Sequence, residues 1–263
     1  MLEDYLGDYL SERGFKAHTE VRAQQNSNRQ VTLLNGELIT NTFQHTKGFN
    51  ARVVKNGVYG FASSSRYSAD TSDLEGVLKN AEDNVALLNS RMAGKLSDFP
   101  ANRALQREDG MEMIIPLTSG ELMEFASEID AYITERYPDL LSRTVRANMV
   151  EVEKLLYTSE GIRSHSYFPR SNLLISLSRL ANDGSPVEIY KVLGGLGPYK
   201  TKFSDPKLVF PEIDSLAEAL ARKAEGVFAE PGLKDVVLDS NITGLLAHEA
   251  IGHTVEADLV RGG

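Results

Sequence analysis

Residues 30–57 read QVTLLNGELITNTFQHTKGFNARVVKNG, and this stretch decides the fold of the first half of the chain. Its two Asn-Gly pairs, Asn35-Gly36 and Asn56-Gly57, each follow a run of strand-forming residues, at 30–34 and 49–54. Asn and Gly tolerate the positive φ angles of a tight turn, so this pair between strand-like runs is a strong hairpin signal. We therefore predict antiparallel strands that form a meander.

Apolar residues at helical spacing predict three helices around these strands. The first lies within the opening residues, from Leu2 to Leu10. The second carries apolar residues from Leu74 to Leu88, and the third carries them from Leu122 to Ile133. Between the second and third helices, residues 91–116 show weak periodicity and are interpreted as a connection.

A second meander is predicted from strand-like runs at 146–157, 162–168 and 173–180. Both halves of the chain, about 1–90 and 117–200, thus read as a helix followed by a meander. This repeated order suggests an internal duplication. The fold class that we predict is α+β, with antiparallel sheets flanked by helices.

The pattern changes near residue 200. The glycine-rich residues 194–198 (GGLGP) predict a flexible loop, and a helix is predicted at about 215–228. Asp235–Asp239 (DVVLD) reads as a short buried strand. A final helix is predicted to begin near Ser240 or Asn241, because either residue is a good N-cap.

Composition restricts the location and the partners of the protein. The chain has a formal net charge of -9 and no dense run of Lys and Arg, so nucleic acid is not an expected partner. It contains no apolar stretch of about eighteen residues, and a membrane span is not expected. The absence of cysteine and of a signal-peptide pattern predicts a cytoplasmic protein.

The final predicted helix carries the residues with the clearest chemical role, His248-Glu249-Ala250-Ile251-Gly252-His253. Neutral imidazole is a good zinc ligand, and a neighbouring Glu can act as a general base in hydrolysis. The structural alternative is that both histidines lie on the helix surface or in the core. For His18, His45 and His165 we favour that structural role, since nothing near them completes a set of ligands.

The spacing of the two histidines constrains the helix. Zinc-binding histidines four residues apart lie about 40° from each other around a regular helix, but residues five apart lie about 140° from each other. A regular helix therefore cannot direct both His248 and His253 to one ion. A wider π-type turn could do so, and such turns are frequent at functional sites. We predict a distorted helix at Ala250–His253, where Gly252 is a poor helix former.

The stretch HEAIGHTVEADLVR, residues 248–261, resembles the HExxxH segment of the TldD/PmbA family, also called the modulator of DNA gyrase family, on its TldD side. The resemblance extends to the Asp235–Asp239 run, the Leu33–Gly36 turn and the Gly57–Gly60 strand. It implies a zinc-dependent peptidase that cleaves peptides or small unfolded proteins. It also implies His248 and His253 as zinc ligands and Glu249 as the catalytic general base.

The resemblance has one departure. Family members use a cysteine from their C-terminal portion as a third zinc ligand, and this chain has no cysteine. The interpretation is therefore an N-terminal domain at 1–200, followed at 201–263 by the start of a metal-binding C-terminal domain that is truncated and inactive alone. Glu256 and Asp258 are the local candidates for an additional ligand or for a residue that supports the ligands, although both also fit a solvent-exposed surface.

The resemblance also concerns partners. It implies assembly with a homologous TldE/PmbA-type subunit or as a homodimer, whereas the composition predicts no membrane or nucleic-acid partner. The alternative function is a non-catalytic peptide-binding or assembly subunit of a TldD/TldE-type complex. The acidic charge gives no support to a direct action on DNA.

Overall fold

The computed structural model describes residues 10, 13–66, 71–91, 106–110, 117–256 and 259. The chain divides into two compact units, Met1–Glu225 and Gly226–Gly263. This division lies after residue 225, whereas the sequence predicted a domain boundary after residue 200. The reason is that helix α5 (Phe210–Ala224) buries Ile213, Leu216 and Leu220 in the core of the first unit.

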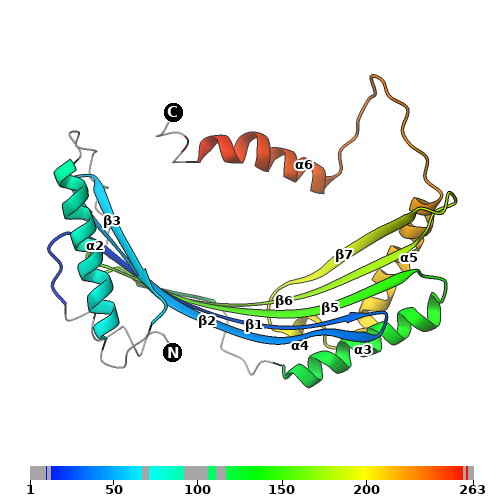
Figure 1. Ribbon diagram of the computed structural model, residues 1–263, viewed down its shortest axis with the longest axis horizontal. Helices are drawn as coiled ribbons and strands as arrows, with labels where there is room; N and C mark the ends of the chain where they lie inside the picture. Colours follow the sequence, from blue (N-terminus) through cyan, green and yellow to red (C-terminus); the bar gives the residue numbers. More distant parts are fainter. Residues whose placement is uncertain are drawn as a thin grey trace. The chain divides into compact units, whose positions relative to one another are not determined.

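The first unit contains one long sheet, and the predicted α+β fold is confirmed (Figure 1). The antiparallel strands run in the order β3-β2-β1-β5-β6, and β7 also pairs with β6. A short strand, β4, pairs with β6 in parallel. The strands are β1 (His18–Leu34), β2 (Glu37–Lys55), β3 (Val58–Ser64), β4 (Gln106–Gly110), β5 (Ser142–Thr158), β6 (Arg163–Leu180) and β7 (Pro186–Leu196).

Both predicted hairpin turns are confirmed. Asn35 and Gly36 have φ angles of 52° and 84°, and Asn56 and Gly57 have φ angles of 55° and 72°. The first turn connects β1 to β2 and the second connects β2 to β3. The first turn also contacts β5, since the backbone N–H of Arg143 donates to Asn35 Oδ1 at 2.9 Å. The turn therefore helps to align the two meanders.

The described helices of the first unit cover the two ends of the sheet (Figure 1). Helix α2 (Ser72–Arg91) packs against β2 and β3, and α3 (Ser119–Arg136) packs against β1 and β5. The remaining helical segments are α4 (Tyr199–Lys202), a 3-10 turn at Pro206–Val209, and α5, which packs on β6 and β7. Among the described residues, no helix combines the length and the apolar character that a membrane span requires.

Two separate hydrophobic cores lie on the same face of the sheet. In β1 the buried residues Val21 and Ala23 belong to the core under α2, whereas Val31 and Leu33 belong to the core under α3 and α5. Successive residues of a strand point to opposite faces, and all four of these residues are odd-numbered. Both cores therefore lie against one face of the sheet, whereas exposed apolar residues such as Phe61 of β3 and Tyr190 of β7 occur on the other.

A polar stretch separates the two cores on this face. Glu153 of β5 is only 2% exposed, and it accepts a hydrogen bond from Gln25. His165 Nε2 lies 3.0 Å from the other carboxylate oxygen of Glu153, and Tyr167 donates to Glu151. Burial, together with this hydrogen bond and the charge of Glu151, raises the pKa of the Tyr167 hydroxyl. Buried polar groups are tolerated here because they are paired with one another.

Several expectations about the first unit are wrong in detail. The supposed connection at 91–116 contains β4, and the two runs at 162–168 and 173–180 form the single strand β6, which continues through Pro169. Pro169 lies where the outer neighbour of β6 changes from β4 to β7, so its missing N–H interrupts neither pairing. The opening helix lies outside the described residues, apart from the helical Leu10.

The predicted loop at 194–198 overlaps the end of β7. Gly194 has a φ angle of 126°, and a Cβ atom there would lie 2.0 Å from the carbonyl oxygen of Ser171. The close approach of β7 to β6 therefore requires a glycine at position 194, and a flexible loop is not needed to explain this residue. The predicted helix at about 215–228 begins earlier, at Phe210, and ends at Ala224.

Substitution of Gly60 tests the contact between α2 and β3. A Cβ atom on Gly60 would lie 2.1 Å from the carbonyl oxygen of Ala81 and 2.5 Å from the backbone nitrogen of Val85. We expect Gly60→Ala to lower the free energy of unfolding by about 2–3 kcal/mol, because overpacking forces α2 away from the sheet.

The matched control is Gly76→Ala, in the exposed interior of α2, where nothing lies within 4 Å of the added atom. This change should stabilise the protein by about 0.5–1 kcal/mol through helix propensity. Urea unfolding of both variants measures the difference. Equal unfolding midpoints for the two variants would contradict the proposed contact.

Glu121 provides a pH-dependent contribution to stability. The pKa of the Glu121 carboxyl is lowered to about 2 by a hydrogen bond from Lys200 and by another from the backbone N–H of Thr118. The second hydrogen bond belongs to the capping box that Thr118 and Glu121 form. Since the folded pKa is depressed, the contribution is complete above the ordinary value of 4.5 and is lost as the pH falls toward 2.

We therefore expect Glu121→Gln to lower the melting temperature at pH 6, and the difference from the unchanged protein should close between about pH 4.5 and pH 2. Thermal unfolding at low ionic strength measures it. Glu124→Gln, an exposed position on the same helix, serves as the control. A difference that persists undiminished at the acid end would refute this role.

Candidate metal centre

The second unit contains the helix that carries the candidate residues. Helix α6 (Ser240–Ala247) begins after Asp239, whose Oδ1 accepts the backbone N–H of Ile242 at 2.9 Å. The N-cap is thus Asp239, one residue before the predicted Ser240. The buried strand predicted at Asp235–Asp239 is wrong, since Val237 is 98% exposed and no strand occurs in the described part of this unit. An apolar run alone does not make a strand without a neighbour for its backbone.

The helix widens at the two histidines, which confirms the predicted distortion. Residues His248–Gly252 form a π turn, which starts two residues before the predicted position. The backbone N–H of His253 donates to the carbonyl oxygen of His248, the five-residue hydrogen bond of a π-helix. As a result the two imidazole rings are 4.6 Å apart, centre to centre. Gly252 lies within this turn and has the low α-helix propensity that favours such a departure.

The π turn brings three potential ligands together. One ligand atom from each of His248, Glu249 and His253 lies within 4.8 Å of the other two. His253 Nε2 is 3.6 Å from Glu249 Oε2, which is longer than a hydrogen bond. The side chains of Glu249 and His253 are 59% and 46% exposed. Two imidazoles and a carboxylate are the donor types that zinc accepts, so the residues fit this ion.

The other predicted residues have different positions. Glu256 is outside the group of three, and its Oε1 lies 2.6 Å from Nδ1 of His253. Asp258 lies outside the described residues. The hydrogen bond between Glu256 and His253 was not predicted from the sequence. The only available signal was the spacing of three residues, which many surface carboxylates share.

The remaining histidines belong to the first unit and are not members of the group of three. His18 Nδ1 is 2.7 Å from Glu160 Oε1, and His165 pairs with Glu153. Each of these contacts satisfies an imidazole within the sheet. Among the described residues, His248, Glu249 and His253 are the cluster with the arrangement of a metal site.

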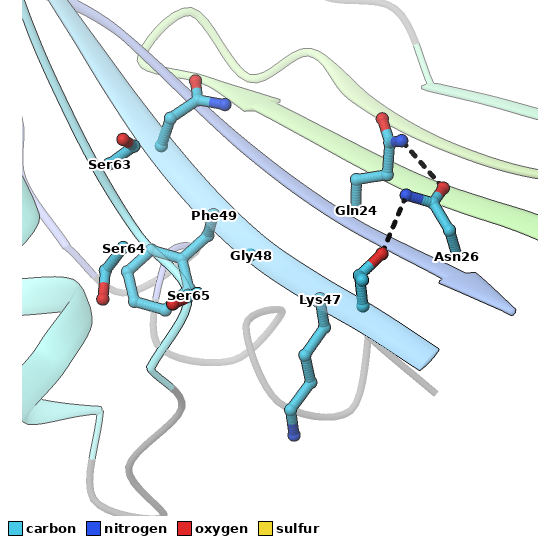
Figure 2. Close-up of a pocket in the computed structure, with 10 residues that line it drawn as sticks. Gln24, Asn26, Lys47, Gly48, Phe49, Ser63, Ser64 and Ser65 are labelled. Carbon is cyan, nitrogen blue, oxygen red and sulfur yellow. Dashed lines mark hydrogen bonds between the residues drawn. The ribbon is translucent and has the colours of Figure 1, made fainter. Parts of the chain in front are cut away.

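The first unit also has a hollow of about 510 Å³ at the end of β3 (Figure 2). Its labelled lining residues are Gln24, Asn26, Lys47, Gly48, Phe49, Ser63, Ser64 and Ser65. Gln24 donates to Asn26 at 2.8 Å, so part of the polar lining is already hydrogen-bonded. No histidine or carboxylate is among its lining residues, so the hollow lacks the side chains that most often bind zinc.

Part of the first unit matches a known protein family. Residues 19–85, from β1 to α2, match the family model described as PmbA/TldA metallopeptidase domain 1. The resemblance to the TldD/PmbA family is thereby confirmed. The matched residues do not include the His248 segment, so the site depends on its own geometry.

The chain is similar to proteins that carry the name metalloprotease. One, from Methanothermobacter thermautotrophicus, is 28% identical over 268 residues, which cover 99% of this chain and 55% of the relative. Another, from Synechocystis, is 25% identical and covers 98% of this chain and 53% of the relative. The chain thus spans about half the length of the curated relatives it matches.

Solved structures share the fold. TldE from Thermococcus kodakarensis has a TM-score of 0.57 at 10% identity, over 84% of this chain and 47% of that protein. A protein from Thermotoga maritima, named as a candidate modulator of a DNA gyrase, has a TM-score of 0.58 at 14% identity, over 85% of this chain and 46% of its own. At these identities the likeness concerns the fold alone.

The metal site can be tested by removing its imidazoles. We expect the chain to bind one zinc ion, and His248→Asn or His253→Asn to weaken binding by at least about 100-fold, because each removes a ligand nitrogen. Competition with a chromophoric chelator measures the affinity. His45→Asn, at an exposed position of β2, is the control and should bind zinc like the unchanged chain. Equal affinity in all four proteins would exclude the site.

Proposed function

We propose that this chain contributes the metal-binding helix and the general base of a zinc-dependent peptidase of TldD type, which cleaves peptides or small unfolded proteins. The observation that carries the proposal is the π turn. It places His248 and His253, five residues apart, beside Glu249 with ligand atoms within 4.8 Å. A regular helix would separate the two imidazoles, so the distortion has a direct use in metal binding.

Each residue of the cluster has a proposed role. His248 and His253 hold the zinc ion through imidazole nitrogen atoms. When bound, the ion supplies Lewis acidity that polarises the carbonyl group of the scissile peptide. Glu249 accepts a proton from the attacking water and then delivers it to the leaving amine. The exposure of Glu249 and His253 leaves room for a peptide to approach.

The proposal requires a further ligand. Catalytic zinc sites normally have three protein ligands, and the two histidines supply only two of them. Glu249 cannot be both a permanent ligand and a free general base.

A homologous TldE/PmbA-type subunit or a second copy of the chain is the proposed partner in assembly. Light scattering of the purified chain, alone and mixed with such a subunit, measures this assembly, and a monomer in both samples would reject it.

Glu249→Gln separates the general base from the ligands. We expect this variant to keep the zinc affinity of the unchanged chain and to lose hydrolysis of a fluorescent unfolded peptide by about 10²- to 10⁴-fold, because the amide cannot accept the proton. Both are measured on zinc-loaded protein, alone and with the homologous subunit. A large loss of zinc affinity would instead make Glu249 a ligand.

The same experiment judges the alternative function. A non-catalytic peptide-binding or assembly subunit would bind the unfolded peptide without cleaving it, both alone and with its partner. If the unchanged zinc-loaded chain shows this behaviour in both conditions, the peptidase proposal fails. The assembly function then replaces it.

A further inference from the structure

We propose that Glu256 is a positioning residue, which fixes the tautomer and orientation of His253 so that Nε2 is the atom available to the metal. The inference rests on the proposed function and adds a residue to the same site. It follows from the way in which the chain leaves the π turn.

His253 and Glu256 are joined twice. A single 3-10 turn, His253–Val255, follows the π turn, and the backbone N–H of Glu256 donates to the carbonyl oxygen of His253 at 3.3 Å. The side chain of Glu256 folds back toward the start of this turn, and its Oε1 lies 2.6 Å from His253 Nδ1. Glu256 itself has an extended backbone, with φ −62° and ψ 137°. The backbone link and the side-chain link together limit the rotation of the imidazole.

The chemistry of the pair determines the position of the proton. An ionised carboxylate can only accept hydrogen bonds, so a contact of 2.6 Å requires that His253 Nδ1 carries the hydrogen. The lone pair of the neutral ring then belongs to Nε2. This nitrogen faces Glu249, 3.6 Å from its Oε2. The tautomer that Glu256 imposes is therefore the one that presents a ligand atom to the cluster.

The same geometry argues against Glu256 as a zinc ligand. The two nitrogen lone-pair directions of an imidazole diverge, so a group bound to Nδ1 lies away from an ion bound to Nε2. Glu256 is accordingly absent from the group formed by His248, Glu249 and His253. Metal-bound histidines commonly donate their second N–H to a carboxylate, which raises the basicity of the ligand atom.

The experiment compares Glu256→Ala and Glu256→Gln with the unchanged chain. The control is Glu230→Ala, which removes the same charge from an exposed position of the same unit. The first measurement is the tautomer of His253, from ¹⁵N chemical shifts of the metal-free protein at alkaline pH. The second is the affinity for Zn²⁺ and Co²⁺, and the third is the visible spectrum of bound Co²⁺, which reports its coordination.

We expect the unchanged chain and the control to show His253 with the hydrogen on Nδ1. Glu256→Ala should give a mixture of tautomers and a metal affinity lower by about 10- to 100-fold, with the same stoichiometry and Co²⁺ spectrum. Glu256→Gln should retain more affinity than Glu256→Ala, because its amide oxygen can still accept from Nδ1–H.

Two results would overturn the proposal. A changed Co²⁺ spectrum or a lost binding site in Glu256→Ala would make Glu256 a ligand, and an unaltered tautomer would show that the carboxylate does not direct the ring. Failure of the proposed function is separate. It would appear as an unchanged chain that binds no metal, and the tautomer in the metal-free protein would still decide the role of Glu256.

Discussion

The pairing of β1 with β5 is the interaction on which the first unit depends. These strands run antiparallel from Glu20 opposite Thr158 to Leu34 opposite Thr144 without a break in register. Each strand is also the first strand of its meander, so β2 and β3 extend the sheet on one side while β6 and β7 extend it on the other. Without this central pair the two meanders would be separate sheets. The symmetric order agrees with the repeated pattern of the sequence, and the duplication itself stays a prediction.

Local signals predicted much of this unit. The Asn-Gly turns were predictable because positive φ angles strongly restrict the residue type, and α3 was predictable because Leu122 and Ile133 belong to one apolar stripe with the buried residues between them. In α2 the stripe was less reliable at its end, since Leu88 is 40% exposed. Strand β4 could not be predicted, because Gln-Arg-Glu-Asp-Gly has no strand-forming pattern and its pairing with β6 is a non-local contact.

Non-local contacts explain the other differences. The close approach of Gly194 to Ser171 depends on the pairing of β7 with β6, and no pattern within residues 194–198 contains that information. The opposite error occurred at Asp235–Asp239, where a strand-like composition has no strand partner within the described part of its unit. In both cases the deciding factor is the neighbouring segment, which a local reading of the sequence does not include.

The candidate site was predictable to a different degree. The spacing of His248 and His253 required a π turn if both were to serve one ion, and a geometric requirement of this kind can be read from residue numbers. The hydrogen bond from His253 to Glu256 could not be derived in this way. It depends on the 3-10 turn through which the helix ends, and that turn is a feature of the backbone.

The placement of the two hydrophobic cores on shared strands has a consequence for folding cooperativity. Val21 and Val31 lie on the same strand but in different cores, and the paired polar stretch around Glu153 lies between them. Neither core can open without disturbing backbone hydrogen bonds that the other core keeps in register. Continuous strands thus couple the two apolar clusters into one cooperative folding unit.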